Sequence, residues 1–434
     1  MPETGEVVLG RDSSRERKLL VLETDYTLQG IRQRGIEHSI LCRDLDGYFS
    51  KVWSVHPFAS LVTSPGYTPR FGRPVEHHLS HCHTFIEGKV GRYATLKHLF
   101  ALNFLLSQAD LFLRLKALIR RERISVIRVA NPLYLGLFGL ALARSTRIPL
   151  VVRVGANNDK IRAMTGKPMA PRLLRSQRLE KAIERFVFKR ADLVAGANQD
   201  NLDFALANGA TTERSTLFRY GNLVDRRHFT DPAARGDCAN LLRDLSVQRG
   251  NFLLYVGRLE PIKQPDHVVA VLAKLRGQGL DLKAVLAGEG SMREDLRTCA
   301  RELGVDDALV LAGNLTQADL AILYPAAAVV ISPHTGRALA EAAMGAAPVV
   351  AYDVDWQGEL VENLKTGLLV PYQDVGGMVE AAKQLIDDRG AARELGKNLR
   401  EKALSILNPA NLDEHERQEY RKLLARVTVA MAGQ

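Results

Sequence analysis

The second half of the chain alternates between short apolar runs and longer segments in which apolar residues recur at helical spacing. Six runs rich in Val, Leu, Ile and Ala occupy residues 252–257, 283–287, 309–312, 328–332, 349–352 and 367–370. Short continuous apolar runs of this kind are typical of strands that are buried on both faces. Their alternation with helices predicts an α/β domain, in which helices cover both faces of a parallel sheet.

The first half shows the same alternation less regularly. Runs that predict strands occupy 18–23, 38–42, 125–130, 149–154, 191–197 and 215–221, and helical patterns occupy 93–123, 133–144, most of 160–190, and 198–208. Residues 44–93 hold four prolines and predict irregular structure. No G-x-G-x-x-G follows the first predicted strand, so the dinucleotide-binding fingerprint is absent.

The length of the chain and these patterns predict two domains. A chain of 434 residues exceeds what one hydrophobic core usually organises. The segment 231–250 is polar and is broken by Pro232 and Gly236, as connections between domains often are. We expect Rossmann-like domains over 1–235 and 236–410, followed by a helix over 411–434 that packs back across the domain junction.

The charge of the chain is concentrated in its first half. The net charge is +10, but residues 246–434 hold 21 Lys and Arg against 25 Asp and Glu, and the first 245 residues hold 38 against 24. Ten of these cations fall within 160–190. This asymmetry indicates either an anionic partner, such as lipid headgroups, a diphosphate-bearing substrate or nucleic acid, or simply a solvated basic face.

The remaining composition bears on the compartment. The cysteines at 42, 82, 238 and 299 form no C-x-x-C and no cluster, which favours a reducing environment. The polar first 17 residues do not resemble a secretory signal, and no uncharged apolar run approaches the roughly 20 residues that span a bilayer. We expect a cytoplasmic protein.

The pattern over 93–123 ends in Arg120-Arg121-Glu122-Arg123 and predicts either a helix that docks peripherally on the inner face of an anionic membrane or a core helix.

Two loops at predicted strand ends carry residues suited to an anion. Arg258 and Lys263 follow the first strand of the second half, and Pro333–Arg337 follow the fourth and lead into an Ala-rich helix that contains Glu341. Parallel sheets bind ligands beyond the carboxyl ends of their strands. The first amides of a helix and a nearby cation pair together favour a diphosphate. A plain solvated loop would be the better interpretation if either element stood alone.

A set of motifs in the second half matches one known family. The motifs are Gly257-Arg258-Leu259 with Lys263, Ala287-Gly288-Glu289-Gly290, Leu311-Ala312-Gly313, Glu341-Ala342-Ala343, Pro348-Val349-Val350-Ala351 and Gly367-Leu368-Leu369-Val370-Pro371. They resemble the donor-binding domain of glycosyltransferase family 4, and Tyr220–Asp225 is similar to its pre-linker motif. The resemblance covers roughly 190 to 390 well and the first 190 residues only in pattern. It implies the GT-B fold, in which two Rossmann-like domains with parallel sheets face each other across a cleft.

The resemblance also implies roles for single residues. Arg258 and Lys263 would hold the donor diphosphate and stabilise charge on the leaving group. Glu341 matches the second carboxylate of the family's Glu, seven residues, Glu motif and would bind the ribose hydroxyls. The other donor-binding residues that it implies are Gly257, Gly288, Thr335, Gly336, Arg337 and Ala338.

One position departs from the family. The first carboxylate of the Glu, seven residues, Glu motif should stand at 333, where this chain has Pro333. We expect His334 to take over its contact with the donor sugar by hydrogen bonding and to belong to the catalytic group. A changed donor preference and impaired catalysis are the alternatives.

Other patterns suggest metal or acceptor sites. The segment 77–83, HHLSHCH, is either a metal site or a polar surface loop, and we expect the loop. Asp353 and Asp355, like Asp44 and Asp46, have the D-x-D form that other glycosyltransferases use for a metal. Asp353 and Asp355 are expected to contact substrate or cap a helix. We expect neither a metal nor another cofactor.

The predicted acceptor side rests on a weaker pattern. Asn157, Asn158 and Asp159 follow a predicted strand of the first half and are expected to face the acceptor, although the family's usual glycine pair and histidine are not recognisable there.

We therefore expect a retaining glycosyltransferase that moves a sugar from a nucleotide diphosphate donor to an acceptor held by the basic first domain. A lipid-linked or cell-envelope acceptor suits that charge, and we expect no nucleic acid partner. The alternatives are a nucleotide-sugar epimerase on the same fold and a catalytically silent homologue that binds nucleotide sugar.

Overall fold

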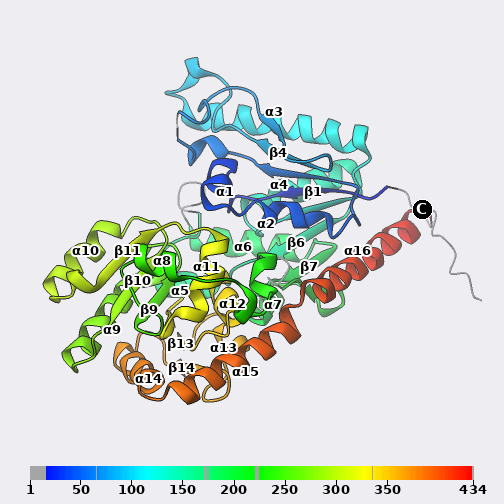
Figure 1. Ribbon diagram of the computed structural model, residues 1–434. Helices are drawn as coiled ribbons and strands as arrows, with labels where there is room; N and C mark the ends of the chain where they lie inside the picture. Colours follow the sequence, from blue (N-terminus) through cyan, green and yellow to red (C-terminus); the bar gives the residue numbers. More distant parts are fainter. Residues whose placement is uncertain are drawn as a thin grey trace, which may run out of the picture.

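The computed structural model describes residues 16–64, 66–170, 174, 176–219, 224–334 and 336–432. Two sheets, each covered by helices, form the upper and lower parts of the molecule in Figure 1. The first sheet has the order β3-β4-β2-β1-β5-β6-β7-β8, and only β3 runs antiparallel to its neighbour. Its strands are β1 (Lys18–Leu22), β2 (Lys51–His56), β3 (Val75–His78), β4 (His83–Glu87), β5 (Val126–Val129), β6 (Leu150–Val154), β7 (Leu193–Gly196) and β8 (Ser215–Leu217).

Helices on both faces bury the first sheet. Leu, Ile and Val from the strands pack against helical residues in two clusters, one on each face, because central parallel strands have no face left for water. The helices of this part are α1 (Leu28–Arg34), α2 (His38–Leu41), α3 (Phe100–Glu122), α4 (Tyr134–Thr146), α5 (Asn158–Thr165), α6 (Gln177–Phe188) and α7 (Gln199–Ala207).

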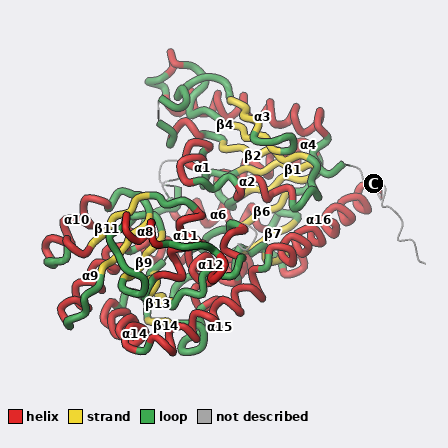
Figure 2. The backbone as a smooth tube through the Cα atoms, viewed as in Figure 1, coloured by secondary structure: helices red, strands yellow, loops and turns green. Residues whose placement is uncertain are grey.

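The second sheet is wholly parallel, with the order β11-β10-β9-β12-β13-β14. Its strands are β9 (Phe252–Val256), β10 (Lys283–Ala287), β11 (Leu309–Gly313), β12 (Val329–Ser332), β13 (Val349–Tyr352) and β14 (Leu368–Val370). All six coincide with predicted runs. The helices are α8 (Ala239–Asp244), α9 (Pro265–Gly277), α10 (Arg293–Glu302), α11 (Gln317–Leu323), α12 (Arg337–Met344), α13 (Gln357–Leu360), α14 (Val375–Asp387) and α15 (Arg389–Leu407). Figure 2 shows yellow strands surrounded by red helices in both parts.

The last helix, α16 (Pro409–Ala432), returns from the second part to the first, as the red ribbon in Figure 1 shows. Tyr420 and Leu423 are buried in the cluster that also holds Leu19 of β1 and Val126 of β5. Arg128 Nη1 lies 3.6 Å from Glu416 Oε2 and 3.5 Å from the Tyr420 hydroxyl. Apolar packing and a buried ion pair therefore attach α16 to the first sheet.

Two predictions for the first half are wrong. Residues 38–42 form no strand, because His38–Leu41 is the single helical turn α2, in which Ser39 Oγ donates to the Ile36 carbonyl over 2.7 Å. The apolar residues Ile40, Leu41 and Cys42 fit a buried helical turn as well as a strand. Residues 44–93 are not irregular, because they contain β2, β3 and β4, and their described prolines stand between these strands. The segment 77–83 comprises the end of β3, the loop 79–82 and the first residue of β4, so it is the turn of a hairpin and contains the expected loop.

The described part of the chain has no helix long and apolar enough to cross a membrane. The family-like motif at 220–225 lies mostly outside the described residues, because only Val224 and Asp225 belong to them.

The packing of α16 generates a stability prediction. Tyr420 is fully buried, so Tyr420→Ala leaves a cavity against the first sheet and should lower the free energy of unfolding by about 3–5 kcal/mol. The thermal midpoint of the variant should fall by several degrees in a calorimetric scan. Val429→Ala, on an exposed part of the same helix, should change the free energy of unfolding by less than about 0.5 kcal/mol. Its thermal midpoint should therefore stay close to that of the wild type. Equal midpoints for the two variants would contradict the attachment of α16.

Candidate functional site

A cleft with a volume of about 890 Å³ opens between the two sheets. Its walls are the segments that follow β1, β5 and β6 of the first sheet and β9, β10, β12 and β13 of the second. These are carboxyl ends of parallel strands, where ligands of such sheets bind. The predicted residues that line the cleft are Gly257, Arg258, Lys263, Gly288, His334, Gly336, Arg337, Ala338, Glu341 and Asn158.

Glycines let two strand ends approach closely at the floor of the cleft. Gly288 has φ +147°, and a Cβ at this position would lie 1.9 Å from the carbonyl oxygen of Gly257. The Gly257 amide donates to the Ala287 carbonyl over 3.0 Å, and the Gly288 amide donates to the Gly313 carbonyl over 2.8 Å. A side chain at 288 would push these segments apart, so glycine is required there.

Arg258 and Lys263 stand on the loop that leaves β9. The Tyr255 hydroxyl donates to the Arg258 carbonyl over 2.9 Å and so fixes the backbone of this loop. Neither cationic side chain makes a hydrogen bond or an ion pair with any residue that the structure describes. Burial, followed by repulsion from Arg258, lowers the pKa of Lys263 to about 8. Lys263 is half-buried and Arg258 is exposed, and two neighbouring cations that make no ion pair favour an anion between them.

The first turn of α12 faces the same space. Gly336 precedes it with φ +60° and ψ −126°, a conformation open essentially to glycine alone. The helix begins at Arg337, so its first amides are oriented towards the cleft. Thr335 lies outside the described residues.

Glu341 lies one turn into α12 and is buried at the wall of the cleft. The Tyr324 hydroxyl donates to Glu341 Oε2 over 3.2 Å, and Arg337 Nε lies 3.4 Å from Glu341 Oε1. These contacts hold the carboxylate in one place. Such a fixed carboxylate can accept hydrogen bonds from neighbouring ligand hydroxyls.

His334 and Asp355 form a second polar group in the cleft. His334 Nδ1 lies 3.1 Å from the Ile262 carbonyl oxygen, and its Nε2 lies 3.6 Å from Asp355 Oδ2. Asp355 has φ +57°, and its Oδ1 is buried without a hydrogen-bond partner in the described structure. The Pro333 carbonyl accepts from Gln357 Nε2 over 2.9 Å. Thus Asp355 brings a carboxylate to the part of the cleft where Pro333 supplies none, whereas Asp353 does not line it.

The first domain adds charged groups that the sequence analysis did not select. Arg34, at the end of α1, lines the cleft with an exposed side chain, and partial desolvation followed by repulsion from Arg258 lowers its pKa. Desolvation by the surrounding cleft atoms, followed by repulsion from Glu23, raises the pKa of Asp25 to about 6, although the residue is exposed to solvent. The position of Asp25 directly after β1 is a signal that could have identified it. Arg34 stands on a helix, where sequence gives no such signal.

The predicted acceptor-side residues are mainly engaged with other protein groups. Asn158 lines the cleft but donates to Glu184 Oε1 over 2.7 Å. Asn157 caps α5 and donates to Asp200, and Asp159 pairs with Arg162 and Lys181 at 2.8 and 2.6 Å. Asn157 and Asp159 do not line the cleft. The structure therefore brings one of the three to the predicted place.

The histidine-rich segment has a different position. Cys82 Sγ lies 3.0 Å from His83 Nδ1 and 4.0 Å from Asp44 Oδ2. These three residues are the only group of three or more potential metal ligands whose ligand atoms lie close together in the described parts of the chain. They lie where β2 and β4 begin, at the opposite edge of the sheet from the cleft.

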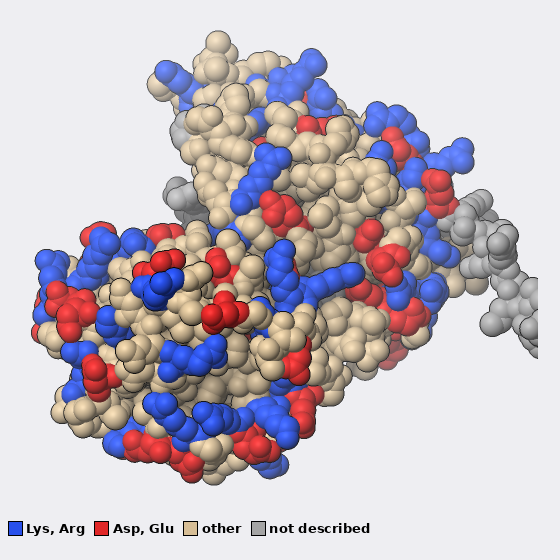
Figure 3. Space-filling view, in the orientation of Figure 1, with Lys and Arg blue, Asp and Glu red and all other residues tan. Residues whose placement is uncertain are grey.

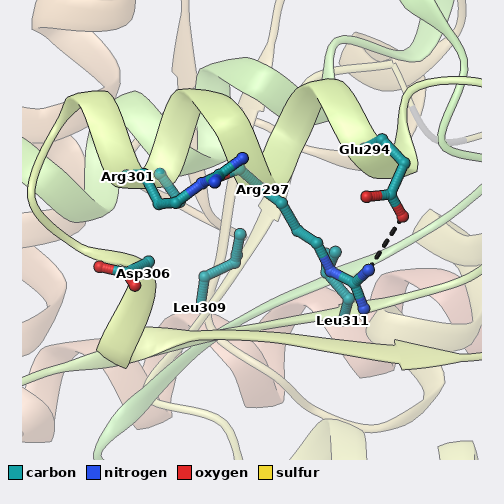
Figure 4. A pocket seen from close by; sticks show the side chains of 7 residues that line it. Glu294, Arg297, Arg301, Asp306, Leu309 and Leu311 are labelled. Atoms are coloured by element: carbon teal, nitrogen blue, oxygen red, sulfur yellow. Dashed lines mark hydrogen bonds and ion pairs between the residues drawn. The ribbon is translucent and has the colours of Figure 1, made fainter.

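A second hollow, of about 480 Å³, lies between α10 and β11 at the edge of the second sheet. Figure 4 shows Arg297 paired with Glu294, at 2.9 Å, above Leu309 and Leu311. None of the predicted site residues lines this hollow.

Comparison with protein families identifies the class. Residues 24–221 match the family described as "Glycosyl transferase 4-like domain", and residues 243–402 match "Glycosyl transferases group 1". The two matches together cover most of the chain, one for each sheet. The chain belongs to glycosyltransferase family 4.

Curated relatives align with part of the chain. A D-inositol 3-phosphate glycosyltransferase from Pseudarthrobacter chlorophenolicus is 29% identical over 273 residues, which cover 60% of this chain and 62% of the relative. A glycogen synthase from Mycobacterium tuberculosis is 34% identical over 157 residues, covering 35% of this chain and 38% of the relative. The match therefore spans less than two thirds of either relative.

Solved structures resemble the chain over almost its whole length. Sucrose-phosphate synthase from Thermosynechococcus elongatus has a TM-score of 0.71 at 19% identity, covering 94% of this chain and all of that one. Anabaena HepE in complex with UDP and glucose has a TM-score of 0.68 at 16% identity, with coverage of 94% and 100%. At these identities the likeness shows the fold, which is GT-B.

The surroundings of Lys263 generate a pH prediction. Because its pKa is lowered, the ammonium group loses its charge as the pH rises through about 8. Carbon NMR of the reductively methylated protein should show one lysine that titrates near pH 8 and is missing in Lys263→Arg. Arg258→Ala removes the repulsion and should move this pKa towards the ordinary value. A spectrum in which no lysine titrates below pH 9 would contradict the described burial.

Proposed function

We propose that the protein is a glycosyltransferase that moves a sugar from a nucleotide diphosphate sugar to an acceptor, with retention of the anomeric configuration. One observation carries the proposal: Arg258 and Lys263, unpaired within the described structure, share a cleft with the amide-lined start of α12 and with the fixed carboxylate of Glu341. Cations and amides suit a diphosphate, and the carboxylate suits the ribose hydroxyls. Family membership and the GT-B fold support the same assignment.

The leaving diphosphate gains negative charge as the bond to the sugar breaks. Arg258, Lys263 and the first amides of α12 stabilise this charge more in the transition state than in the bound donor, so they accelerate the step. The acceptor hydroxyl attacks the face that the diphosphate leaves, and a diphosphate oxygen takes its proton. No separate general base is then needed.

The same cations serve where a metal could otherwise neutralise the diphosphate, so we propose that the reaction proceeds in the presence of a chelator. Because Lys263 loses its charge above about pH 8, donor affinity should decrease in that range.

Asp355 is proposed to supply the sugar contact that Pro333 cannot make. Its carboxylate lies beside His334 at the wall of the cleft and retains an oxygen without a partner among the described residues. We propose that Asp355 and His334 together bind the donor sugar hydroxyls. A residue held at positive φ in a ligand cleft fits this role.

The acceptor is proposed to be lipid-linked or part of the cell envelope, and the protein to bind anionic membrane peripherally. The support is the excess of 14 positive charges in the first 245 residues, since basic segments are attracted to anionic lipid surfaces. No nucleic acid is proposed as a partner.

A screen of nucleotide sugars by thermal shift, followed by an assay of nucleoside diphosphate release, tests the function. One donor should raise the melting temperature, because it binds only the native state. Lys263→Ala and Arg258→Ala should each lower turnover by roughly two to three powers of ten. Lys274→Ala, an exposed cation on α9, is the matched control and should retain full activity. Proton NMR of the product should show retention.

Asp355→Asn separates the sugar contact from the diphosphate site. It should lower turnover of the donor roughly ten-fold or more while leaving the affinity for the nucleoside diphosphate unchanged, because a carboxylate to hydroxyl bond is lost. Tight donor binding without turnover on any acceptor would support the silent homologue, which Pro333 motivates. Interconversion of two donor sugars without an acceptor would support the epimerase.

A further inference from the structure

The first half of α3 has its polar face turned inwards. Asn103, Ser107 and Gln108 are buried on the side that faces the domain. Asn103 Oδ1 accepts from the amides of Arg92 and Tyr93 over 2.7 and 2.9 Å. Ser107 Oγ donates to the Lys89 carbonyl over 2.6 Å, and Gln108 Oε1 accepts from the Tyr134 hydroxyl over 2.6 Å. These hydrogen bonds fix the rotation of the helix.

The outward face of the same segment is apolar. Of the fifteen large apolar side chains that are exposed among the described residues, seven lie between 93 and 113. Leu105 and Leu113 are 64% and 65% exposed. We call this set the α3 apolar face: Tyr93, Leu99, Phe100, Leu102, Leu105, Leu106 and Leu113. A helix on a water-exposed surface normally shows the reverse arrangement, and a contiguous apolar patch marks an interaction site.

Cations surround the α3 apolar face. Residues 92–123 hold seven Lys and Arg against Asp110 and Glu122. Asp110 already pairs with Arg114 at 3.0 Å, and Glu122 pairs with Arg121 at 3.1 Å. In Figure 3 Lys and Arg gather along the upper rim, which is the part of the molecule where α3 lies in Figure 1. The apolar face with a basic border complements anionic headgroups above hydrocarbon.

The face is also continuous with the cleft. Because α3 leads into β5, its first turn lies at the edge of the sheet where the parallel strands end. The ring of Phe100 stacks on Phe104 at 6.2 Å between centroids, and Phe104 lies 6.1 Å from both Phe58 and Tyr134. Phe58 and Tyr134 line the cleft. A row of aromatic rings therefore connects the exposed surface with the site.

We propose that the α3 apolar face inserts into the interface of an anionic lipid bilayer, and that the aromatic row guides the apolar tail of the acceptor from the bilayer towards the cleft. The insertion extends the peripheral membrane binding proposed above, and the guiding role rests in addition on the proposed sugar transfer. A bilayer is chosen over a protein partner because cations precede and follow the apolar residues along the chain and the patch leads into the substrate cleft.

Vesicle flotation of the full chain tests the insertion. Wild type should float with phosphatidylglycerol-containing vesicles at low salt, weakly with pure phosphatidylcholine vesicles, and less at high salt. Leu102→Glu/Leu105→Glu should lower the bound fraction at least ten-fold. Leu303→Glu/Leu364→Glu adds the same charge at exposed positions of the second domain and should float like wild type. Matching thermal midpoints establish that both variants fold.

The outcomes separate the two parts. Wild type that ignores the anionic vesicles, a Leu102/Leu105 variant that floats like wild type, or equal binding to neutral vesicles would overturn the insertion. Transfer of labelled sugar from the donor into an organic-extractable product, using membrane lipid extract as acceptor, should fall with the same variant. Unchanged transfer would overturn the guiding role. If neither the wild type nor any variant releases nucleoside diphosphate, the proposed function is overturned instead. The flotation result still tests the insertion in that case.

Discussion

Two positive charges that make no ion pair within the described structure, Arg258 and Lys263, determine how this protein can work. Arg258 and Lys263 are held at the carboxyl edge of the second sheet by backbone contacts rather than by partners of their own side chains. The burial of Lys263 and, second, its repulsion from Arg258 lower the pKa of Lys263. An anion bound between Arg258 and Lys263 offsets both the desolvation of Lys263 and the repulsion between the two cations. The cations are already in place before the anion binds, so their side chains need not move.

The first domain, which forms the opposite wall of the cleft, must be held at a fixed position relative to Arg258 and Lys263. Glu359 of α13 accepts from the Gln199 amide and pairs with Arg219, each at 2.6 Å, and so connects the second domain to the segments that follow β7 and β8. The helix α16 connects the domains a second time, through Tyr420 and the ion pair between Arg128 and Glu416.

The sequence predicted those parts whose physical signal is local. The strands of the second sheet are short apolar runs, of which only the edge strand β11 is half-buried along its whole length. Gly257, Gly288 and Glu341 follow strands at positions that topology brings together. It failed where the signal depends on tertiary structure. His38–Leu41 fits a strand or a helical turn equally well. The described prolines of residues 44–93 lie in the connections between strands, so they did not prevent β2, β3 and β4 from forming. Arg34 reaches the cleft only through the folded arrangement of the two domains, so no spacing in the sequence reveals it. The position of Asp355 after a predicted strand did indicate substrate contact, but its approach to His334 depends on the folded loops.

Calorimetric titration with a nucleoside, its monophosphate and its diphosphate tests the central claim most directly. If Arg258, Lys263 and the start of α12 grip a diphosphate, wild type should bind the diphosphate at least a hundred-fold more tightly than the monophosphate at pH 7. Arg258→Ala/Lys263→Ala should abolish most of that difference while the affinity for the nucleoside is retained. Equal affinities of wild type for the three ligands, or a double variant that still prefers the diphosphate a hundred-fold, would contradict the account.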